Sequence, residues 1–558
     1  MSVIVPAVKS MSLRGACLLM VCAQSWAMPA VPGAGEIWQE TVPAATLNAP
    51  APEDRVLPVA PRKPRRDVDQ EQTFPVARLL VTGNHEITSA ALQPLLSVPA
   101  GRQMSLSDLW QVADRISEYY HRHGYLLARA YVPAQDVSSG QVTIAVLEGR
   151  YGQVRLENTS HVRTSVLSRF LEPIGHGGVV SQAHLQEQLY LMNDVPGAAV
   201  TSVLQPSQQV GASDLLVNAN ATPWVSGSVG VDNWGNRYTG AWRTYADIDV
   251  YSPLQMGDHF SAYLMDTHYG DTQYGRVSYD LPVDGRGTRV GVAYGDLAYA
   301  LGKNFAGLQA HGTASSSSLY LMQSLLRGPD DNLSMQVSFD NRYLNDNADA
   351  THTADNKHIN AYSLAFNGDH RGDQGSMSSF SAILTGGQLF LDALSRLQDQ
   401  AAYQTQGGYF KALLSANTLQ GLPDGLSFYG ALSAQLANKS LDPAEKMPLG
   451  GPTGVRAYPQ GEALVDRGVL GSAEIRYALS TRVQTSLFAD MAQGYQNQNP
   501  LPSDPGNVRS LSGLGVGLLA NPGQQININT YLAWRTGPAP TSAPDRKPTV
   551  WVQLSKSF

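Results

Sequence analysis

The residues of this chain that could carry catalysis are few and poorly spaced for it. His121 and His123 are two positions apart in a predicted helix, so they lie on different faces and are poorly placed to share a metal ion. His85 and Glu86 lack the second helical histidine of a zinc-protease motif. Residues 513–517 (GLGVG) imitate a nucleotide loop, but they fall inside a predicted strand that no helix follows. The sequence therefore predicts no catalytic residue, no metal site and no cofactor.

One stretch instead combines an unusual composition with a charged side chain. Residues 450–462 (GGPTGVRAYPQGE) hold too much Gly and Pro for a strand or a helix, yet they include Arg456. Further along, the predicted strand 483–491 carries Asp490 and Phe488 on its polar face. Because an arginine presents a planar fork that fits a carboxylate, we expect this loop to fold inward and Arg456 to pair with Asp490. The alternative is a solvent-exposed loop cation.

Composition and the N-terminus restrict the class of protein. The 558 residues carry a formal charge of -7 and only 15% charged side chains, so no basic field favours nucleic acid. Residues 1–27 form a predicted secretory signal, with a basic start, an apolar run and cleavage after Ala27. This run is too short to cross about 30 Å of hydrocarbon as a helix. Cys17 and Cys22 both lie within the signal, so the exported chain is predicted to contain no disulfide.

Two repeated units follow a linker. Residues 28–73 are rich in proline and predict a linker with at most a short helix around residues 36–40. Residues 74–149 then show the pattern strand, helix, helix, strand, strand, and residues 150–222 repeat it. Each unit has its own set of periodic apolar positions, which predicts two similar α/β modules in tandem.

The remaining residues, 223–558, lack helical periodicity. Residues 225–231 alternate apolar and polar side chains, and about sixteen such segments can be placed at the spacing of membrane strands joined by short turns and long loops. The chain ends on Phe558, an aromatic residue that suits a barrel assembly signal. A soluble β-sandwich or propeller is the alternative. Three connections are predicted to be much longer than their neighbours: residues 302–317, 345–357 and 439–466.

This organisation resembles the two-partner secretion transporters, or TpsB proteins, of the filamentous haemagglutinin and haemolysin transporter family. The resemblance covers residues 74–558 and rests on several short motifs taken together. They are VTGN at 81–84, YYHRHGY at 119–125, DNWG at 232–235 with Thr239, Gly240 and Arg243, Pro253-Leu254 with Gly257-Asp258, and VRAY at 455–458. The resemblance implies a transmembrane β-barrel of 16 antiparallel strands, preceded by two periplasmic α+β POTRA modules, with loop 449–466 folded into the barrel.

The resemblance also implies a function and partners. Such a protein is an outer-membrane translocase of a Gram-negative bacterium, not an enzyme. It captures an unfolded exoprotein in the periplasm through its POTRA modules and exports it through the pore without nucleotide. The implied partners are a large secreted adhesin, haemolysin or contact-dependent toxin, outer-membrane lipid and the barrel assembly machinery, with no nucleic acid. The chain is expected to be a monomer.

The resemblance assigns roles to the loop residues. Arg456 contacts Asp490 on the barrel wall, with Tyr458 and Phe488 packed beside the pair. Gly454, Val455 and Ala457 complete the motif. This chain departs from the family pattern at Ala457, where glycine is usual, so the conformation of the loop tip stays open.

Other functions predict features that this sequence lacks. A barrel-protein assembly or insertion factor of the same superfamily is the nearest alternative, but such factors usually carry more than two POTRA modules. A passive porin would lack the modules, and a barrel phospholipase would need a Ser-His pair at the rim.

Overall fold

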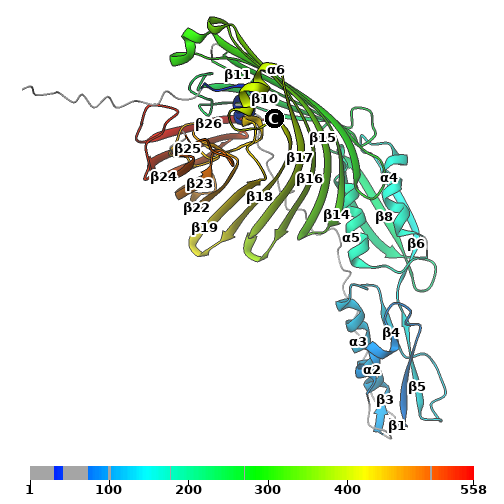
Figure 1. Ribbon diagram of the computed structural model, residues 1–558. Helices are drawn as coiled ribbons and strands as arrows, with labels where there is room; N and C mark the ends of the chain where they lie inside the picture. The colour runs from blue at the N-terminus through cyan, green and yellow to red at the C-terminus, as the bar shows by residue number, and fades with distance from the viewer. Residues whose placement is uncertain (1–30, 42–72, 98–101, 176, 269–270, 503–505) are drawn as a thin grey trace, which may run out of the picture.

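The computed structural model describes residues 31–41, 73–97, 102–175, 177–268, 271–502 and 506–558. Its largest part is a closed barrel of sixteen antiparallel strands, and two small α/β modules extend in series from one rim (Figure 1). Among the described residues, no helix is long and apolar enough to cross a membrane. The predicted signal 1–27 and most of the predicted linker lie outside the described residues.

The first module has its own core and a short mixed sheet. Its elements are β1 (Thr73–Val76), β2 (Arg78–Thr82), α2 (Ser89–Leu96), β3 (Arg102–Ser105), α3 (Leu106–Arg122), β4 (Arg129–Tyr131) and β5 (Gln141–Leu147). Strand β5 lies between β2 and β4, and β1 pairs with β3. Ser105 and Asp108 form a reciprocal capping box that fixes the start of α3. The apolar stripe of α3 then packs on the sheet, with Leu109 and Ile116 fully buried.

The second module repeats this plan and continues directly into the barrel. Its elements are β6 (Arg150–Asn158), α4 (Thr164–Leu171), the short 3-10 helix η1 (Glu172–Ile174), α5 (Gln182–Asn193), β7 (Ala198–Pro206) and β8 (Ala212–Ala221). The sheet order is β6-β8-β7, and helices α4 and α5 pack against it around buried Phe170 and Leu185.

The barrel strands differ greatly in length. They are β9 (Val225–Asp232), β10 (Arg243–Tyr251), β11 (His259–Thr267), β12 (Thr272–Pro282), β13 (Thr288–Ala300), β14 (Ala310–Arg327), β15 (Asp331–Ala348), β16 (Thr353–Arg371), β17 (Met377–Leu391), β18 (Gly407–Gly421), β19 (Leu426–Ala437), β22 (Arg467–Ser480), β23 (Val483–Tyr495), β24 (Val508–Gly523), β25 (Ile526–Arg535) and β26 (Thr549–Ser557). The barrel closes where β26 pairs with β9 over only five residue pairs. The expected sixteen-strand barrel is therefore confirmed.

The predictions of long connections at residues 302–317 and 345–357 are wrong. Strand β14 already begins at Ala310, and strands β15 and β16 are separated only by residues 349–352, which include the short 3-10 helix η3 (Asp349–Thr351). The ends of these strands carry polar residues on both faces, as in the serine run 315–318. Polar side chains on both faces remove the apolar-polar alternation by which a strand is recognised in sequence.

Smaller elements occupy the connections. A helix, α6 (Ala393–Gln400), follows β17, and the 3-10 helices η2 (Lys303–Leu308), η4 (Asp373–Gly375) and η5 (Pro423–Gly425) lie in other loops. The connection from β19 to β22 contains η6 (Pro443–Glu445) and the two-residue strands β20 (Met447–Pro448) and β21 (Leu464–Val465), which pair with each other.

A helix from the predicted linker lies inside the barrel. Helix α1 (Ala34–Thr41) packs against β13, β14, β15 and η6. Ile37 and Trp38 belong to the main apolar cluster of the barrel, and the Trp38 ring meets Tyr274 edge to face at 5.7 Å between centroids. Gly35 permits this packing, because a Cβ there would stand 2.7 Å from the backbone nitrogen of Ala444. The short predicted helix is thus a lumenal element.

Candidate functional site: the loop inside the barrel

The connection between β19 and β22 folds back into the lumen as a buried loop. Val455, Tyr458 and Leu449 are fully buried, and they pack against Phe488 of β23 and Leu511 of β24. The turn is closed by its own backbone, since the N–H of Val455 donates to the carbonyl of Leu449 at 2.8 Å. The loop therefore presents a fixed tip to the barrel wall.

Arg456 lies at this tip and contacts the wall through almost every donor it has. Its Nε donates to Asp490 Oδ2 at 2.9 Å and its Nη2 to Asp490 Oδ1 at 2.7 Å, which is a bidentate pair. Its backbone N–H also donates to Asp490 at 3.1 Å. Nη1 reaches Glu474 at 2.6 Å and Nη2 reaches Ser472 at 2.9 Å. Arg456 is only 5% exposed and Asp490 only 2%.

The charges around this tip balance. Arg456 lies between the carboxylates of Asp490 and Glu474, and Arg476 donates to the second oxygen of Glu474 at 2.8 Å. Two cations thus face two anions in a buried position, where an unpaired charge would be strongly unfavourable. The guanidinium also lies 3.5 Å from the centroid of the Phe488 ring. Phe488 and the ion pair therefore hold the tip together.

Ala457 fits because the wall has a glycine opposite it. A Cβ added at Gly513 would collide with the Cβ of Ala457, so the methyl of the loop occupies the space that a side chain would take on β24. The next inward glycine, Gly515, likewise leaves room for the Phe488 ring. The glycine run 513–517 therefore shapes the wall around the loop, and it lies inside a strand as predicted.

The loop also contacts the last strand of the barrel and the connection before it. The indole N–H of Trp551 on β26 donates to the carbonyl of Arg456 at 2.7 Å, and Thr549 donates to Ala457 at 3.1 Å. The hydroxyl of buried Tyr458 donates to the carbonyl of Pro538 at 2.8 Å. Through these contacts the loop bridges β22 and β23 to the strand that closes the barrel.

Glu462 forms a second buried anchor at the end of the loop. It is 1% exposed and accepts hydrogen bonds from the backbone and hydroxyl groups of Thr541 and Ser542, between 2.6 and 3.1 Å. Arg509 of β24 forms an ion pair with the same carboxylate. Glu462 therefore fixes the connection between β25 and β26 onto the loop.

The first part of the connection is anchored by further ion pairs. Glu445 contacts Arg342 of β15 at 2.9 Å and Lys411 of β18 at 2.8 Å. Asp442 contacts Lys357 at 3.3 Å. The 3-10 helix η6 belongs to the same connection as the loop and also packs on helix α1. The ion pairs that hold η6 to the barrel wall therefore support both the loop and the helix.

Helix α1 meets the tip region through Glu40. Both oxygens of Glu40 accept from the amide of Asn236, at 3.2 and 2.9 Å, and Gly461 of the loop lies directly beside the carboxylate. Burial raises the pKa of Glu40 to about 7, against the opposing effects of the Asn236 hydrogen bond and Arg243. Burial, together with the neighbouring Glu40, also raises the pKa of Glu36. Docking of helix α1 in the lumen is therefore strongest when the carboxyl groups of Glu36 and Glu40 are protonated.

Comparisons with known proteins identify the family. The model described as haemolysin secretion/activation protein ShlB/FhaC/HecB matches residues 211–520, and that of the POTRA domain, ShlB-type, matches residues 74–149. The chain belongs to the ShlB/FhaC/HecB family. The heme/hemopexin transporter protein HuxB of Haemophilus influenzae (strain 86-028NP) is 31% identical over 474 residues, which are 83% of this chain and 84% of the relative.

Solved structures agree with the family fold. CdiB from Escherichia coli superposes with a TM-score of 0.71 at 21% identity, over 89% of this chain and 93% of that one. CdiB from Acinetobacter baumannii gives a TM-score of 0.64 at 18% identity, with the same coverage. As a member of the ShlB/FhaC/HecB family, this chain is an outer-membrane transporter of two-partner secretion. Its POTRA modules lie in the periplasm, and its partner is a large secreted exoprotein.

Phe558 continues the pairing between β26 and β9. Its backbone N–H donates to Gly227 on β9 at 3.0 Å and its carbonyl accepts from the same residue at 3.2 Å. The side chain is 60% exposed and lies over Gly227, where a Cβ would stand 2.7 Å from the ring. The role of Phe558 as an assembly signal stays a prediction.

Several residues of this site escaped the sequence reasoning. Glu474 occupies a lumen-facing position of β22, but nothing in the sequence marks it as a second partner of Arg456. Glu462 and Trp551 gave no signal, since a loop acid and a strand tryptophan are common. The short helix around residues 36–40 was predicted, but nothing in the sequence placed it inside the barrel. Among the described residues, no group of His, Cys, Asp and Glu side chains is arranged to hold a metal ion.

Proposed function

We propose that this chain binds one unfolded exoprotein with its POTRA modules and releases it through the barrel after helix α1 and the loop are displaced from the lumen. The observation that carries the proposal is the occupied lumen. Helix α1 and the loop share η6 and the Glu40–Gly461 contact, so displacing one weakens the support of the other. No nucleotide is required, because folding of the exoprotein outside the cell draws the rest of the exoprotein outward through the barrel.

Arg456 and Asp490 are proposed to keep the loop in its working position during export. Their bidentate contact and burial support this role, together with the stacking of Phe488 on the guanidinium. Tyr458, Val455, Gly454 and Ala457 would set the shape of the tip. We further propose that the chain acts as a monomer, that its outward side chains contact outer-membrane lipid, and that the barrel assembly machinery recognises Phe558.

The exported partner is proposed to serve the acquisition of heme or hemopexin. HuxB, a heme/hemopexin transporter protein, is 31% identical over 83% of this chain, whereas the outer membrane transporter CdiB of Dickeya dadantii is 23% identical over 77% and the hemolysin transporter ShlB of Serratia marcescens is 27% identical over 37%. Adhesins, haemolysins and contact-dependent toxins are the other partner classes to compare.

The decisive experiment is export in a heterologous host. The chain is co-expressed with candidate large exoproteins, and exoprotein in the medium is measured by immunoblot. Export is expected with the full chain and lost on deleting residues 74–149, although the barrel should still migrate faster unheated than heated on gels. A barrel that exports without residues 74–149 would contradict capture by the first module, and absence of export by the full chain would contradict the proposed function.

A further inference from the structure

A cavity of about 610 Å³ lies at the barrel rim that faces away from the POTRA modules. Strand β9 follows the second module, so the end of β9 and the connection after it, residues 233–242, lie at the outer rim. This connection lines one side of the cavity, and residues between 540 and 551, in and before β26, line the other. The cavity therefore lies at the seam where the barrel closes.

The seam is incomplete at this end because β9 stops short of its partner. Pairing between the two strands begins with Asp232 of β9, so residues 549–552 of β26 extend beyond it. Asn233 bridges part of this gap. Its side-chain amide donates to the carbonyl of Val550 at 2.8 Å, and its side-chain oxygen accepts from the N–H of Val552 at 2.8 Å. Asn233 and Val550, one from each side of the gap, both line the cavity.

Three cations from three connections surround the cavity. Arg237 lies between β9 and β10, Lys303 between β13 and β14, and Arg546 between β25 and β26. Within the described part of the chain, no carboxylate forms an ion pair with any of the three. Asp271 is the one acid among the described lining residues. The cavity therefore carries a net positive charge.

The fold fixes the segments that carry two of these cations. The carbonyl of Tyr238 accepts from the N–H of Gly302 at 2.7 Å, which joins the segment of Arg237 to that of Lys303. The hydroxyl of Tyr238 donates to the carbonyl of Ser542 at 2.6 Å. The Nε of Arg237 is buried and has no hydrogen-bond partner among the described residues. Because a buried donor without an acceptor is unfavourable, this nitrogen indicates a site that an acceptor completes.

The same cavity reaches the lipid-facing surface of the barrel. Arg243 pairs with Asp232 on the lumen side, so strand alternation directs the preceding residue, Trp242, outward. Trp551 donates to the loop in the lumen, so Val550 likewise faces outward. Trp242 is 50% exposed and Val550 42%, and both line the cavity. An outward tryptophan at a barrel rim is typical of the membrane interface, where lipid headgroups lie.

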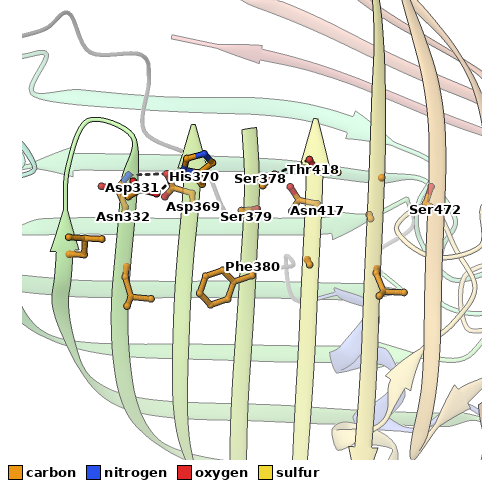
Figure 2. A pocket seen from close by; sticks show the side chains of 16 residues that line it. Asp331, Asn332, Asp369, His370, Ser378, Ser379, Phe380, Asn417, Thr418 and Ser472 are labelled. Carbon is orange, nitrogen blue, oxygen red and sulfur yellow. Dashed lines mark hydrogen bonds and ion pairs between the residues drawn. The ribbon is translucent and has the colours of Figure 1, made fainter. Parts of the chain in front are cut away.

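A larger hollow at the periplasmic strand ends has a different chemistry. It has a volume of about 760 Å³ and is lined by residues of β14 to β22, among them Asp331, His370 and Phe380. Figure 2 shows Asp331 and His370 at these ends, where they contact each other at 2.7 Å. None of its described lining residues is a lysine or an arginine. This hollow therefore lacks the positive charge that the outer cavity has.

We propose that the outer cavity binds the phosphorylated headgroup of a lipid of the outer leaflet, whose acyl chains lie against Trp242 and Val550. Arg237, Lys303 and Arg546 hold the phosphate, because guanidinium and ammonium groups form charge-assisted hydrogen bonds to phosphate oxygens. This inference goes beyond the proposed function, since lipid binding requires no exoprotein.

The volume and the position of the cavity favour a lipid over a free anion. Sites for small molecules have volumes of about 300–1,000 Å³, whereas a group of the size of water takes about 30 Å³. One phosphate would leave most of the 610 Å³ unfilled, and the remaining polar groups of a headgroup occupy that space. Because two lining side chains face the membrane, an amphipathic ligand matches both the charged and the apolar part of the wall.

The inner end of the cavity is the loop inside the barrel. Ala457, Pro459 and Gln460 line it, directly after Arg456 in the chain. A ligand that binds only when these residues are in place stabilises the docked loop by mass action. Lipid bound here should therefore slow opening of the loop, which couples the outer leaflet to the position of Arg456.

Lipid binding by the purified full chain tests the site. The probe is diphosphoryl lipid A, a phosphorylated lipid of the outer leaflet, titrated in detergent and followed by native mass spectrometry. Arg237→Gln, Lys303→Gln and Arg546→Gln should each raise its Kd about tenfold, since each removes a charge-assisted contact. The matched control is Arg467→Gln, which removes an arginine of β22 that does not line the cavity and should leave Kd unchanged. All variants should keep the heat-modifiable migration of a folded barrel.

Competitors identify the source of the phosphate. Lipid A without its phosphate groups should bind at least about tenfold more weakly, and excess inorganic phosphate should not displace the diphosphoryl form. Displacement by inorganic phosphate would overturn the lipid site in favour of a soluble anion. Displacement by a soluble polyglutamate peptide would overturn it in favour of an acidic protein segment. An equal Kd for Arg237→Gln, Lys303→Gln, Arg546→Gln and Arg467→Gln would also refute it.

Hydrogen exchange in phosphatidylcholine nanodiscs gives a readout on the wild-type chain alone. At a lipid A concentration about ten times Kd, protection of residues 233–242 and 456–460 should rise about tenfold, while the periplasmic turn 328–330 exchanges as before. Equal exchange with and without lipid A would contradict the site. Neither test measures export, so failure of the lipid site leaves the proposed function standing, and a chain that exports no exoprotein can still bind the lipid.

Discussion

Replacing Arg456 with alanine tests how strongly the ion pair holds the loop in the lumen. The change leaves Asp490, which is 2% exposed, without its cation, and Glu474, which is 5% exposed, with Arg476 alone. Removing one partner of a buried ion pair costs about 3–5 kcal/mol. The ratio of undocked to docked loop should therefore rise about 150-fold to 5,000-fold. Arg456→Lys should fall between, because one ammonium cannot span Asp490, Glu474 and Ser472 at once.

The undocked population can be measured with a buried cysteine. The exported chain is predicted to contain no cysteine, and Val455 is fully buried in the docked loop. With Val455→Cys as the reporter, a membrane-impermeant maleimide should react only when the loop opens, at a rate that follows the open population. Adding Arg456→Ala should accelerate labelling at least about 150-fold, and secretion should be lost.

An arginine on the outward face of β22 supplies the control. Arg467 lies on β22 with its guanidinium 4.3 Å from the ring centroid of Tyr495. Val455→Cys with Arg467→Ala should label at the rate of Val455→Cys alone, since this change leaves the Arg456 pair intact. If Arg456→Ala also labels at that rate in a barrel that remains heat-modifiable, the ion pair does not hold the loop.

Three further predictions follow from the contacts of the loop, helix α1 and the second module. Gly513→Ala should destabilise the docked loop by about 1–3 kcal/mol through overpacking on Ala457, and the added change Ala457→Gly should restore cysteine protection; a double variant no better than the single would contradict this packing. Because the pKa of Glu40 is about 7 when docked and 4.5 when exposed, docking of α1 is strongest below pH 4.5 and loses about 3 kcal/mol as the pH rises through 7. Pore opening in planar bilayers should therefore increase from pH 5 to pH 8, and this increase should be reduced in Glu40→Gln and reduced further when Glu36→Gln is added, because both buried carboxyls have a raised pKa; a wild-type conductance that is flat over this range would argue against the helix. Arg327→Gln should increase hydrogen exchange in α5 by weakening the Asp194 pair by about 1–3 kcal/mol, with barrel exchange unchanged; equal protection of α5 in both proteins would refute this anchoring.

Strand parity accounts for most of what could be predicted about the site. On β23, one residue in two faces the lumen, so Asp490 and Phe488 were placed correctly from local alternation alone. The same rule put Glu474 on the lumen face without revealing its contact with Arg456. Contacts of Glu462 and Trp551 join segments that are about eighty residues or more apart, and no local pattern records such a distance. Ala457 illustrates this limit, because its fit depends on Gly513 across the lumen.

The sequence by itself determined the class of the protein. Alternation and the two repeated α/β units predicted a membrane barrel preceded by two modules, and the resemblance of several short motifs to the two-partner secretion transporters identified those modules as POTRA modules. Each of these signals is a property of neighbouring residues. Only the tertiary structure decided that helix α1 lies inside the barrel and that Glu474 and Trp551 contact the loop. A closed barrel brings its first and last strands together and turns separate inward residues into one surface. Contacts between residues far apart in sequence arise when the sheet closes into a barrel, and no local sequence pattern records them.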